Sequence, residues 1–318
     1  MLLVVLCLIH YLIFGDYLEI KSTNLNYFEM TNRREFFKTG SLLIAGSLVG
    51  TPLLQASIFK SKGKKNIGLQ LYSLREAMKT DALGTLKLVS DIGFNTLEAA
   101  NYADGKIYGM SPSTFRKVMK GLGMKLTSAH LGGPNYTKET HDTAMDWWKK
   151  ALEDHLEAGC KYMVKPSMPT MKTLDELKMW CDYYNAIGEL TSNEKVLFGY
   201  HNHAREFEKL EGETIYDYMI NHTDPKKVFF EMDVYWVMRG GSKAVDYMNK
   251  YPDRFPVLHI KDEKEIGESG QIDFKPIYET AYKNGMKDSF VEVERYNFEP
   301  IVSVRKSYDF LNTASYVK

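Results

Sequence analysis

The sequence predicts a (β/α)8 TIM barrel, an α/β fold, on three observations. Apolar segments of about five to seven residues recur along the chain and have the character of buried strands. Amphipathic segments of helical periodicity separate them. Eight such strand and helix units in roughly 250 residues fit the size of a (β/α)8 barrel. A doubly wound sheet is the alternative, but the first strand and its turn lack the GxGxxG motif of that fold.

The predicted elements begin after Lys65 and follow one another without a linker. The first strand reads IGLQLYS (residues 67–73), and the helix after it (81–93) carries Leu83, Leu86, Leu88 and Val89 on one side. The other strands are predicted at residues 95–100, 125–133, 160–169, 196–203, 228–236, 257–263 and 289–297. The other helical patterns cover residues 112–122, 138–159, 173–190, 213–222, 243–250, 275–285 and 301–316. Residues 65–318 are therefore expected to form one barrel domain.

The N-terminal region has the pattern of an export signal. The residues before that signal are interpreted as a reading frame that starts too early. Residues 1–15 are apolar but shorter than the roughly 20 residues of a membrane span. A second beginning follows at Met30, with the pair Arg33 and Arg34, an apolar run over 41–54 and small residues near Ala56. This order resembles a twin-arginine signal. We expect residues 1–29 to be absent from the mature protein, residues 30–57 to be the signal, and the mature protein to be periplasmic without a stable membrane anchor. A basic membrane anchor is the alternative.

The charge balance and the cysteine spacing argue against two classes of site, a nucleic-acid-binding surface and a cysteine zinc site. The 41 basic and 41 acidic residues balance, which argues against a broad nucleic-acid footprint. The three cysteines, Cys7, Cys160 and Cys181, lack the close spacing of a zinc site. Cys160 and Cys181 could be free thiols or one disulfide, and the sequence leaves both open.

Polar residues gather where the predicted strands end, which is where barrels of this type place their active sites. They are Glu98, His130, Lys165, His201, Asn202, His203, Glu231, Asp233, Trp236, His259, Lys261, Asp262, Glu292, Glu294 and Arg295. Taken singly, each has an ordinary interpretation as a helix cap or a surface residue. However, residues two apart on a strand share a face, so four such pairs are expected to converge in the barrel. Buried carboxylates in that number need a cation, and mixed imidazole and carboxylate ligands suit Mn²⁺, Co²⁺, Zn²⁺ or Fe²⁺.

In this order the motifs resemble the xylose-isomerase-like barrel superfamily, also called the sugar phosphate isomerase/epimerase family. The resemblance covers residues 66–318 and is carried by GYHNHAREFE, FFEMDVYW, VLHIKDE, GQIDF and FVEVER. It implies one divalent metal, with Mn²⁺ favoured over Co²⁺, Zn²⁺ or Mg²⁺. The ligands implied by motif are His201, Asp233, His259 and Glu292. Epimerases of the family have Glu at the position of His201, and there two Glu residues move protons on opposite faces of the substrate, so a plain two-Glu mechanism is not implied here.

The resemblance also implies roles for the residues around the metal. Catalytic roles are expected for Glu292, Glu294, His203 and Lys261. Substrate-binding roles are expected for Glu98, His130, Lys165, Glu231, Trp236 and Arg295. Glu206, just beyond the two histidines of strand five, is expected to shape the loop instead of touching the metal.

The predicted function is that of a metal-dependent sugar isomerase or epimerase acting on a free sugar or keto-sugar by proton abstraction next to a carbonyl. One alternative is a lyase, hydratase or dehydratase on 3-keto-glycosides or keto-polyols, because the inosose dehydratase branch shares the His-rich strand and the VExE pattern of residues 291–294. Another is a non-catalytic sugar-binding or partner subunit. A nuclease is disfavoured, since nucleases on this barrel use a larger ligand set for three metals and the chain has 8 histidines in total. Members of the superfamily commonly assemble, so a homo-oligomer is left open.

Overall fold

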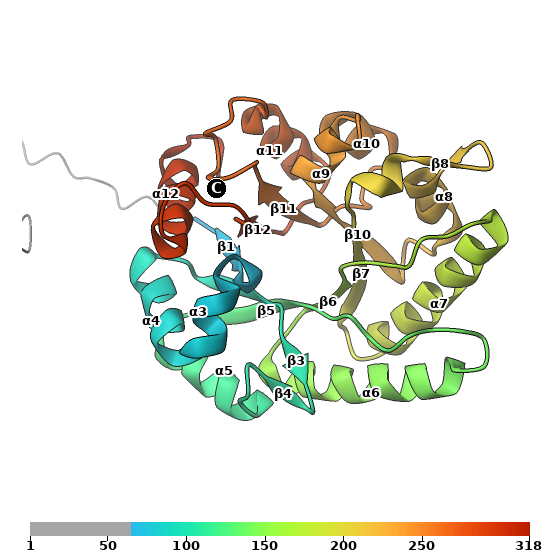
Figure 1. Cartoon of the computed structure of the whole chain (residues 1–318), viewed down its shortest axis with the longest axis horizontal. Coiled ribbons are helices and arrows are strands. Elements are labelled where there is room, and N and C mark those ends of the chain that lie inside the picture. The colour runs from blue at the N-terminus through green and yellow to red at the C-terminus, as the bar shows by residue number, and fades with distance from the viewer. Residues whose placement is uncertain (1–64) are drawn as a thin grey trace, which may run out of the picture. The chain divides into compact units, whose positions relative to one another are not determined.

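Eight parallel strands close into a barrel in the computed structural model, which describes residues 65–318. Figure 1 shows the strands in the middle of the molecule and the helices around them. The predicted (β/α)8 TIM barrel is thereby confirmed. The predicted over-extended start, residues 1–29, and the predicted signal, residues 30–57, lie outside the described residues.

The barrel strands follow one another around the ring in chain order, and the last pairs with the first. They are β1 (Gly68–Gln70), β2 (Thr96–Ala99), β5 (Lys125–His130), β6 (Tyr162–Lys165), β7 (Leu197–His201), β10 (Val228–Asp233), β11 (Val257–Lys261) and β12 (Asp288–Glu292). Two small antiparallel pairs lie outside the ring: β3 (Tyr102–Ala103) with β4 (Lys106–Ile107), and β8 (Lys209–Leu210) with β9 (Glu213–Thr214).

Eight helices match the predicted helical patterns. They are α4 (Ala82–Ile92), α5 (Pro112–Gly121), α6 (His141–Ala158), α7 (Leu174–Ser192), α8 (Ile215–His222), α10 (Ala244–Lys250), α11 (Phe274–Lys283) and α12 (Pro300–Thr313). Their ends follow local chemistry: Ser111 caps α5 by accepting from Thr114 N, and α6 ends at Gly159, whose φ of 95° suits glycine. Among the described helices, none is long and apolar enough to cross a membrane.

Four short helical segments were not predicted, because the sequence reads as strand or loop there. They are η1 (Leu71–Leu74), α3 (Arg75–Thr80), η2 (Ala204–Phe207) and α9 (Val234–Arg239). The predicted strands 67–73 and 228–236 ran too far. The reason is capping: the side chains of Gln70 and Asp233 accept hydrogen bonds from Tyr72 N and Trp236 N, each at 2.9 Å, and so turn the chain into a helix.

The barrel interior has an apolar layer beneath a polar one. Tyr162, Val164, Phe229, Val257 and Phe290 form a buried cluster separate from the main core. Because side chains alternate along a strand, the next residues that point inward, two positions further along β10, β11 and β12, are polar. The cluster therefore forms the floor under the polar layer.

One question that the sequence leaves open is whether Cys160 and Cys181 are bonded to each other. Cys160 and Cys181 are both free and buried. The alternative of a disulfide between them is therefore excluded in the structure.

Candidate metal centre

The four predicted metal ligands meet at the carboxyl ends of β7, β10, β11 and β12. His201, Asp233, His259 and Glu292 are all buried, and one ligand atom from each lies within 4.8 Å of all the others. Strand register brings them together, because Asp233 pairs with His259 and Lys261 pairs with Glu292 on neighbouring strands. The structure thus assembles the predicted set; metal binding itself is a proposal.

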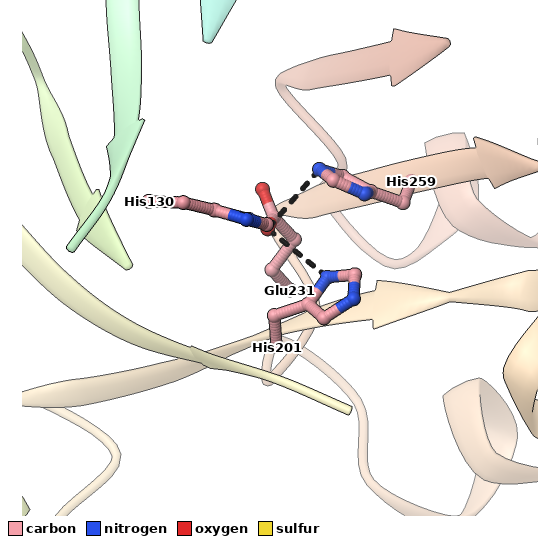
Figure 2. Close-up of side chains that lie close together, drawn as sticks. All are labelled: His130, His201, Glu231 and His259. Atoms are coloured by element: carbon pink, nitrogen blue, oxygen red, sulfur yellow. Dashed lines mark hydrogen bonds and ion pairs between the residues drawn. The ribbon is translucent and has the colours of Figure 1, made fainter. Parts of the chain in front are cut away.

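A second polar group lies beside the first and shares both of its histidines. It consists of His130, His201, Glu231 and His259. Figure 2 shows the three imidazole rings turned toward the Glu231 carboxylate. Oε2 of Glu231 lies 2.7 Å from His130 Nε2, 3.3 Å from His259 Nε2 and 3.4 Å from His201 Nδ1.

The two shared histidines present opposite ring nitrogens to the two groups. His259 Nε2 lies 2.5 Å from Glu98 Oε2, whereas its Nδ1 faces Glu292 Oε2 at 3.6 Å. His201 Nδ1 faces Glu231, and its Nε2 lies 3.9 Å from Asp233 Oδ2. Each imidazole therefore lies between two carboxylates, one on each side. A carboxylate behind the ring, fixing the tautomer of a histidine that binds a metal in front, is the usual arrangement in metal sites.

Unpaired buried atoms mark the side where an ion fits. Within residues 65–318, Asp233 Oδ2 and His259 Nδ1 are buried and have no hydrogen-bond partner. Both face the predicted ligand set. An unpaired buried polar atom costs roughly 1–3 kcal/mol, so a cation that contacts both would remove two such costs. On the opposite side, His201 Nδ1 and Glu231 Oε1 also lack hydrogen bonds, although His201 Nδ1 keeps its 3.4 Å ion contact with Glu231.

The pKa values of the buried carboxylates differ, and the two carboxylates of the predicted ligand set differ most. Burial raises the pKa of Asp233 to about 7. Burial and the charge of Glu98 together raise the pKa of Glu231 to about 7. Glu292 is buried too, but Lys261 and His259 hold its pKa well below the usual range. Of the two proposed carboxylate ligands, Asp233 is therefore the one whose negative charge the neighbouring residues offset least.

The pKa values of the three histidines also differ in direction. Burial opposes charging of His259, but Glu231 and Glu98 raise its pKa well above the usual value. The same two carboxylates raise the pKa of His130. Burial, together with the charges of His259 and His130, lowers the pKa of His201 well below the usual value. A neutral His201 keeps a lone pair for a metal, which is the form that metal ions bind.

Supporting hydrogen bonds hold the carboxylates, and sequence reasoning missed their donors. Glu98 accepts from Gln70 Nε2 at 2.7 Å and from Ser128 Oγ at 2.6 Å. Asn202 accepts from Asp233 N at 3.1 Å, so it fixes the start of the turn after β10. Gln70 is the last residue of β1, and the other polar residues of the site also lie at strand ends. This position in the sequence could have indicated that Gln70 belongs to the site.

Lys261, Glu294, His203 and Trp236 surround the predicted ligands. Lys261 Nζ lies 3.3 Å from Glu292 Oε2 and 3.0 Å from Glu294 Oε2. The side chain of Glu294 is 30% exposed, so it can exchange protons with solvent. The ring of His203 lies 5.0 Å from that of His201 and 5.5 Å from that of Trp236, whose indole Nε1 is buried without a partner.

Other predicted residues lie elsewhere or have other contacts. Glu206 accepts from His203 N at 2.8 Å and from Tyr200 Oη at 2.7 Å, so it shapes the loop as expected. Arg295 is exposed and lies 3.8 Å from Glu263, away from both polar groups. Lys165 donates to the carbonyl of Gly132, and burial lowers its pKa to about 8. The structure does not bring Arg295 or Lys165 into the ligand cluster.

Comparisons with known proteins agree with this architecture. The family model described as the xylose isomerase-like TIM barrel matches residues 86–314. A sugar phosphate isomerase/epimerase from Parabacteroides distasonis ATCC 8503 is 40% identical, covers 80% of this chain and 100% of its own, and superposes with a TM-score of 0.76. A second sugar phosphate isomerase/epimerase from that organism is 33% identical, covers 84% of this chain and 100% of its own, and has a TM-score of 0.77.

A curated relative carries a different activity in its name. The inosose dehydratase of Geobacillus kaustophilus (strain HTA426) is 23% identical over 202 residues, which are 57% of this chain and 64% of that protein. The match therefore spans less than two thirds of the relative's length.

Proposed function

The chain belongs to the xylose isomerase-like TIM barrel family, and on this premise we propose that it is a metal-dependent enzyme that acts on a sugar or keto-sugar. The reaction would begin with removal of a proton from a carbon next to a carbonyl, as in an isomerase or epimerase. The relatives named sugar phosphate isomerase/epimerase support this class. Small sugars suit a site made of converging polar side chains at the carboxyl end of a barrel.

One observation carries the metal part of the proposal. Asp233 Oδ2 and His259 Nδ1 are buried, unpaired and turned toward the same spot as His201 and Glu292. These four residues would hold one divalent cation. Two imidazoles with two carboxylates suit Mn²⁺, our preferred ion, as well as Co²⁺ or Zn²⁺, and fit Mg²⁺ less well.

Glu98 and Glu231 have a different role in this proposal from the one expected of them. Both are fully buried, and both lie behind the shared histidines. We propose that they orient His259 and His201 for the metal instead of binding substrate. The substrate-binding role expected for them from the sequence stays a prediction that the present contacts do not favour.

The bound cation would polarise a substrate carbonyl oxygen and so acidify the neighbouring carbon. The chain's own residues would do the rest. Glu294 is close to Lys261 and partly open to solvent, so it is our candidate to take the proton. Lys261 carries a positive charge beside Glu292 and Glu294 and can donate to a substrate oxygen. The unpaired indole N–H of Trp236 can donate to a hydroxyl.

A dehydratase or lyase of keto-polyols or 3-keto-glycosides is the second candidate, and two observations favour it. His201 stands where the two-Glu epimerases have a carboxylate, so a Glu on each face of the substrate is missing here. Elimination needs only one base for the carbon-bound proton and an acid for the leaving group. In addition, a curated relative is named inosose dehydratase.

The test is turnover with and without metal. The purified protein is stripped with chelator and incubated in deuterated buffer with keto-sugars, a keto-polyol and a 3-keto-glucoside, and products are followed by NMR. We expect deuterium uptake next to the carbonyl, loss of this uptake on stripping, and its return with Mn²⁺. Epimerised sugar identifies an isomerase, and a dehydrated keto product or released aglycone identifies a lyase. Sugar binding without deuterium uptake would show a non-catalytic binding protein, and full activity after stripping would refute the metal.

A further inference from the structure

A cavity lies beyond the carboxyl ends of β1 and β2, at the same end of the barrel as the metal centre. Its volume is about 620 Å³, enough for a sugar ring, and its walls include Tyr72, Arg75, Lys79, Asn101 and Tyr108. None of these residues belongs to the two polar groups of the metal centre. We call it the Tyr72–Arg75 cavity.

Gln70 connects this cavity to the metal centre. Its amide nitrogen donates to Glu98 Oε2 at 2.7 Å, and its amide oxygen accepts from Tyr72 N at 2.9 Å. Just past the end of the neighbouring strand β2, Ala100 and Asn101 of the cavity wall come two and three positions after Glu98. Arg75 of the wall also reaches the end of β12, because its Nη2 donates to the carbonyl of Glu294 at 3.5 Å. A ligand in the cavity would therefore lie next to a substrate that reacts beside Glu294.

The cavity offers a fixed aromatic and cationic wall. Arg75 Nη1 donates to Tyr296 Oη at 2.8 Å, and its guanidinium lies 4.8 Å from the ring centre of Tyr72. Tyr72 is 43% exposed, so its ring is able to pack against a ligand. Tyr108 has a φ of 48° and accepts from Ala100 N through its hydroxyl, so a strained backbone holds it at the wall.

The charges of the cavity are positive on balance. In the described part of the chain, Arg75 and Lys79 form no ion pair with an acidic residue within 4.0 Å. Glu76 is the single acidic residue of the wall. Two unpaired cations beside one carboxylate favour a ligand with a negative group, and a guanidinium suits a planar carboxylate.

We propose that the Tyr72–Arg75 cavity is a subsite for a second sugar ring that carries a carboxylate. The substrate would then be a glycoside that includes an acidic sugar, with the reacting ring at the metal centre and the acidic ring packed on Tyr72. This inference rests on the proposed function for the identity of the reacting ring. The recognition of the acidic ring rests on the cavity alone, so the two can be tested separately.

The test compares two ligands of similar size. Methyl β-D-glucuronide and methyl β-D-glucoside differ in one group, a carboxylate against a hydroxymethyl. Their binding to the full protein is measured by ligand-observed NMR. We expect the glucuronide to bind roughly 10-fold more tightly, as one charged hydrogen bond provides. Arg75→Ala and Lys79→Ala should each reduce this preference. Arg305→Ala, which removes the same charge from an exposed position on α12, should leave it unchanged.

Several results would overturn the subsite. They are equal affinity for the two glycosides, no binding of either at millimolar concentrations, or an equal loss of preference in Arg305→Ala. Lys79 is exposed, so Lys79→Ala tests the charge even if Arg75→Ala fails to fold. The preference should survive chelator treatment, because no wall residue is a proposed metal ligand. A preference for the glucuronide without turnover of any keto-sugar would therefore refute the proposed function but not the subsite.

Discussion

His259 joins two carboxylates from different parts of the barrel. Its Nε2 donates to Glu98 Oε2 at 2.5 Å, because a carboxylate can only accept, and its Nδ1 faces Glu292 Oε2 at 3.6 Å without a hydrogen bond. Glu98 thereby places the ring proton on the side away from Asp233 and Glu292. The nitrogen that remains is the one a metal would use.

Replacing Glu98 by Gln should weaken metal binding without removing a ligand. The amide of Glu98→Gln has almost the shape of the carboxylate, but it no longer demands a proton on His259 Nε2. We expect the affinity for Mn²⁺ to fall about 10–100-fold, as measured by competition with a chromophoric chelator. Ser128→Ala is the matched control, since it removes a hydrogen bond to the same carboxylate and leaves His259 in contact. Unchanged affinity in Glu98→Gln would show that Glu98 does not position the ligand.

Replacing Asp233 by Asn should have opposite effects on metal binding and on the stability of the apo protein. The carboxylate is a proposed ligand, so Asp233→Asn should abolish tight metal binding. In the apo protein at pH 8, burial makes the ionised carboxylate unfavourable, since its pKa is raised to about 7. Removing that charge should raise the free energy of unfolding by about 1–3 kcal/mol. Urea unfolding after chelation measures this change, and Asp91→Asn at an exposed position of α4 is the control. A destabilised apo variant would contradict the argument.

How far the sequence predicts this site depends on strand geometry. The pair His259 and Lys261 was placed correctly in the barrel because residues two apart on a strand share a face. That rule fails where a strand ends. Trp236 lies in α9, which Asp233 caps through Trp236 N, and Arg295 lies past the end of β12 and turns to solvent. Alternation along a sequence carries no information beyond such turns.

Contacts across the barrel are also hidden in the sequence. Glu98 on β2 and His259 on β11 meet although β1 and β12 separate their strands in the ring. Only closure of the barrel brings them together. Strand register likewise sets how deep Glu231 lies in the barrel. Glu231 pairs with His201 on β7 and lies one layer of inward-facing side chains below Asp233. The sequence could therefore predict which residues enter the barrel, but not which of them stand behind the histidines.

Metal affinity should rise with pH through pH 7 and above it, because two proposed ligands must lose protons. Asp233 faces His259, Lys261 and Glu292, and its pKa is raised to about 7, so below that pH a proton competes with the metal for its oxygen. His259, whose pKa is raised as well, must also release a proton from Nδ1. We expect the Mn²⁺ affinity to increase roughly 10-fold per pH unit for each proton released. Titrations between pH 5.5 and 8.5 measure the slope; a dissociation constant independent of pH would exclude proton displacement at these residues.

The floor of the site depends on a glycine two residues before His201. A Cβ at Gly199 would lie 2.5 Å from Phe229 Cζ, within the apolar cluster beneath the polar layer. Gly199→Ala therefore forces Phe229 to move, and overpacking of this kind costs about 1–3 kcal/mol. Gly121→Ala at the end of α5 is the control, because a Cβ there meets no atom within 4 Å and should be neutral or stabilising. Thermal unfolding measures the stability of both variants, and Mn²⁺ titration measures their metal affinity. We expect only Gly199→Ala to lose stability and to bind metal more weakly. If Gly199→Ala had wild-type stability, the apolar cluster would repack without cost and would not determine the position of His201.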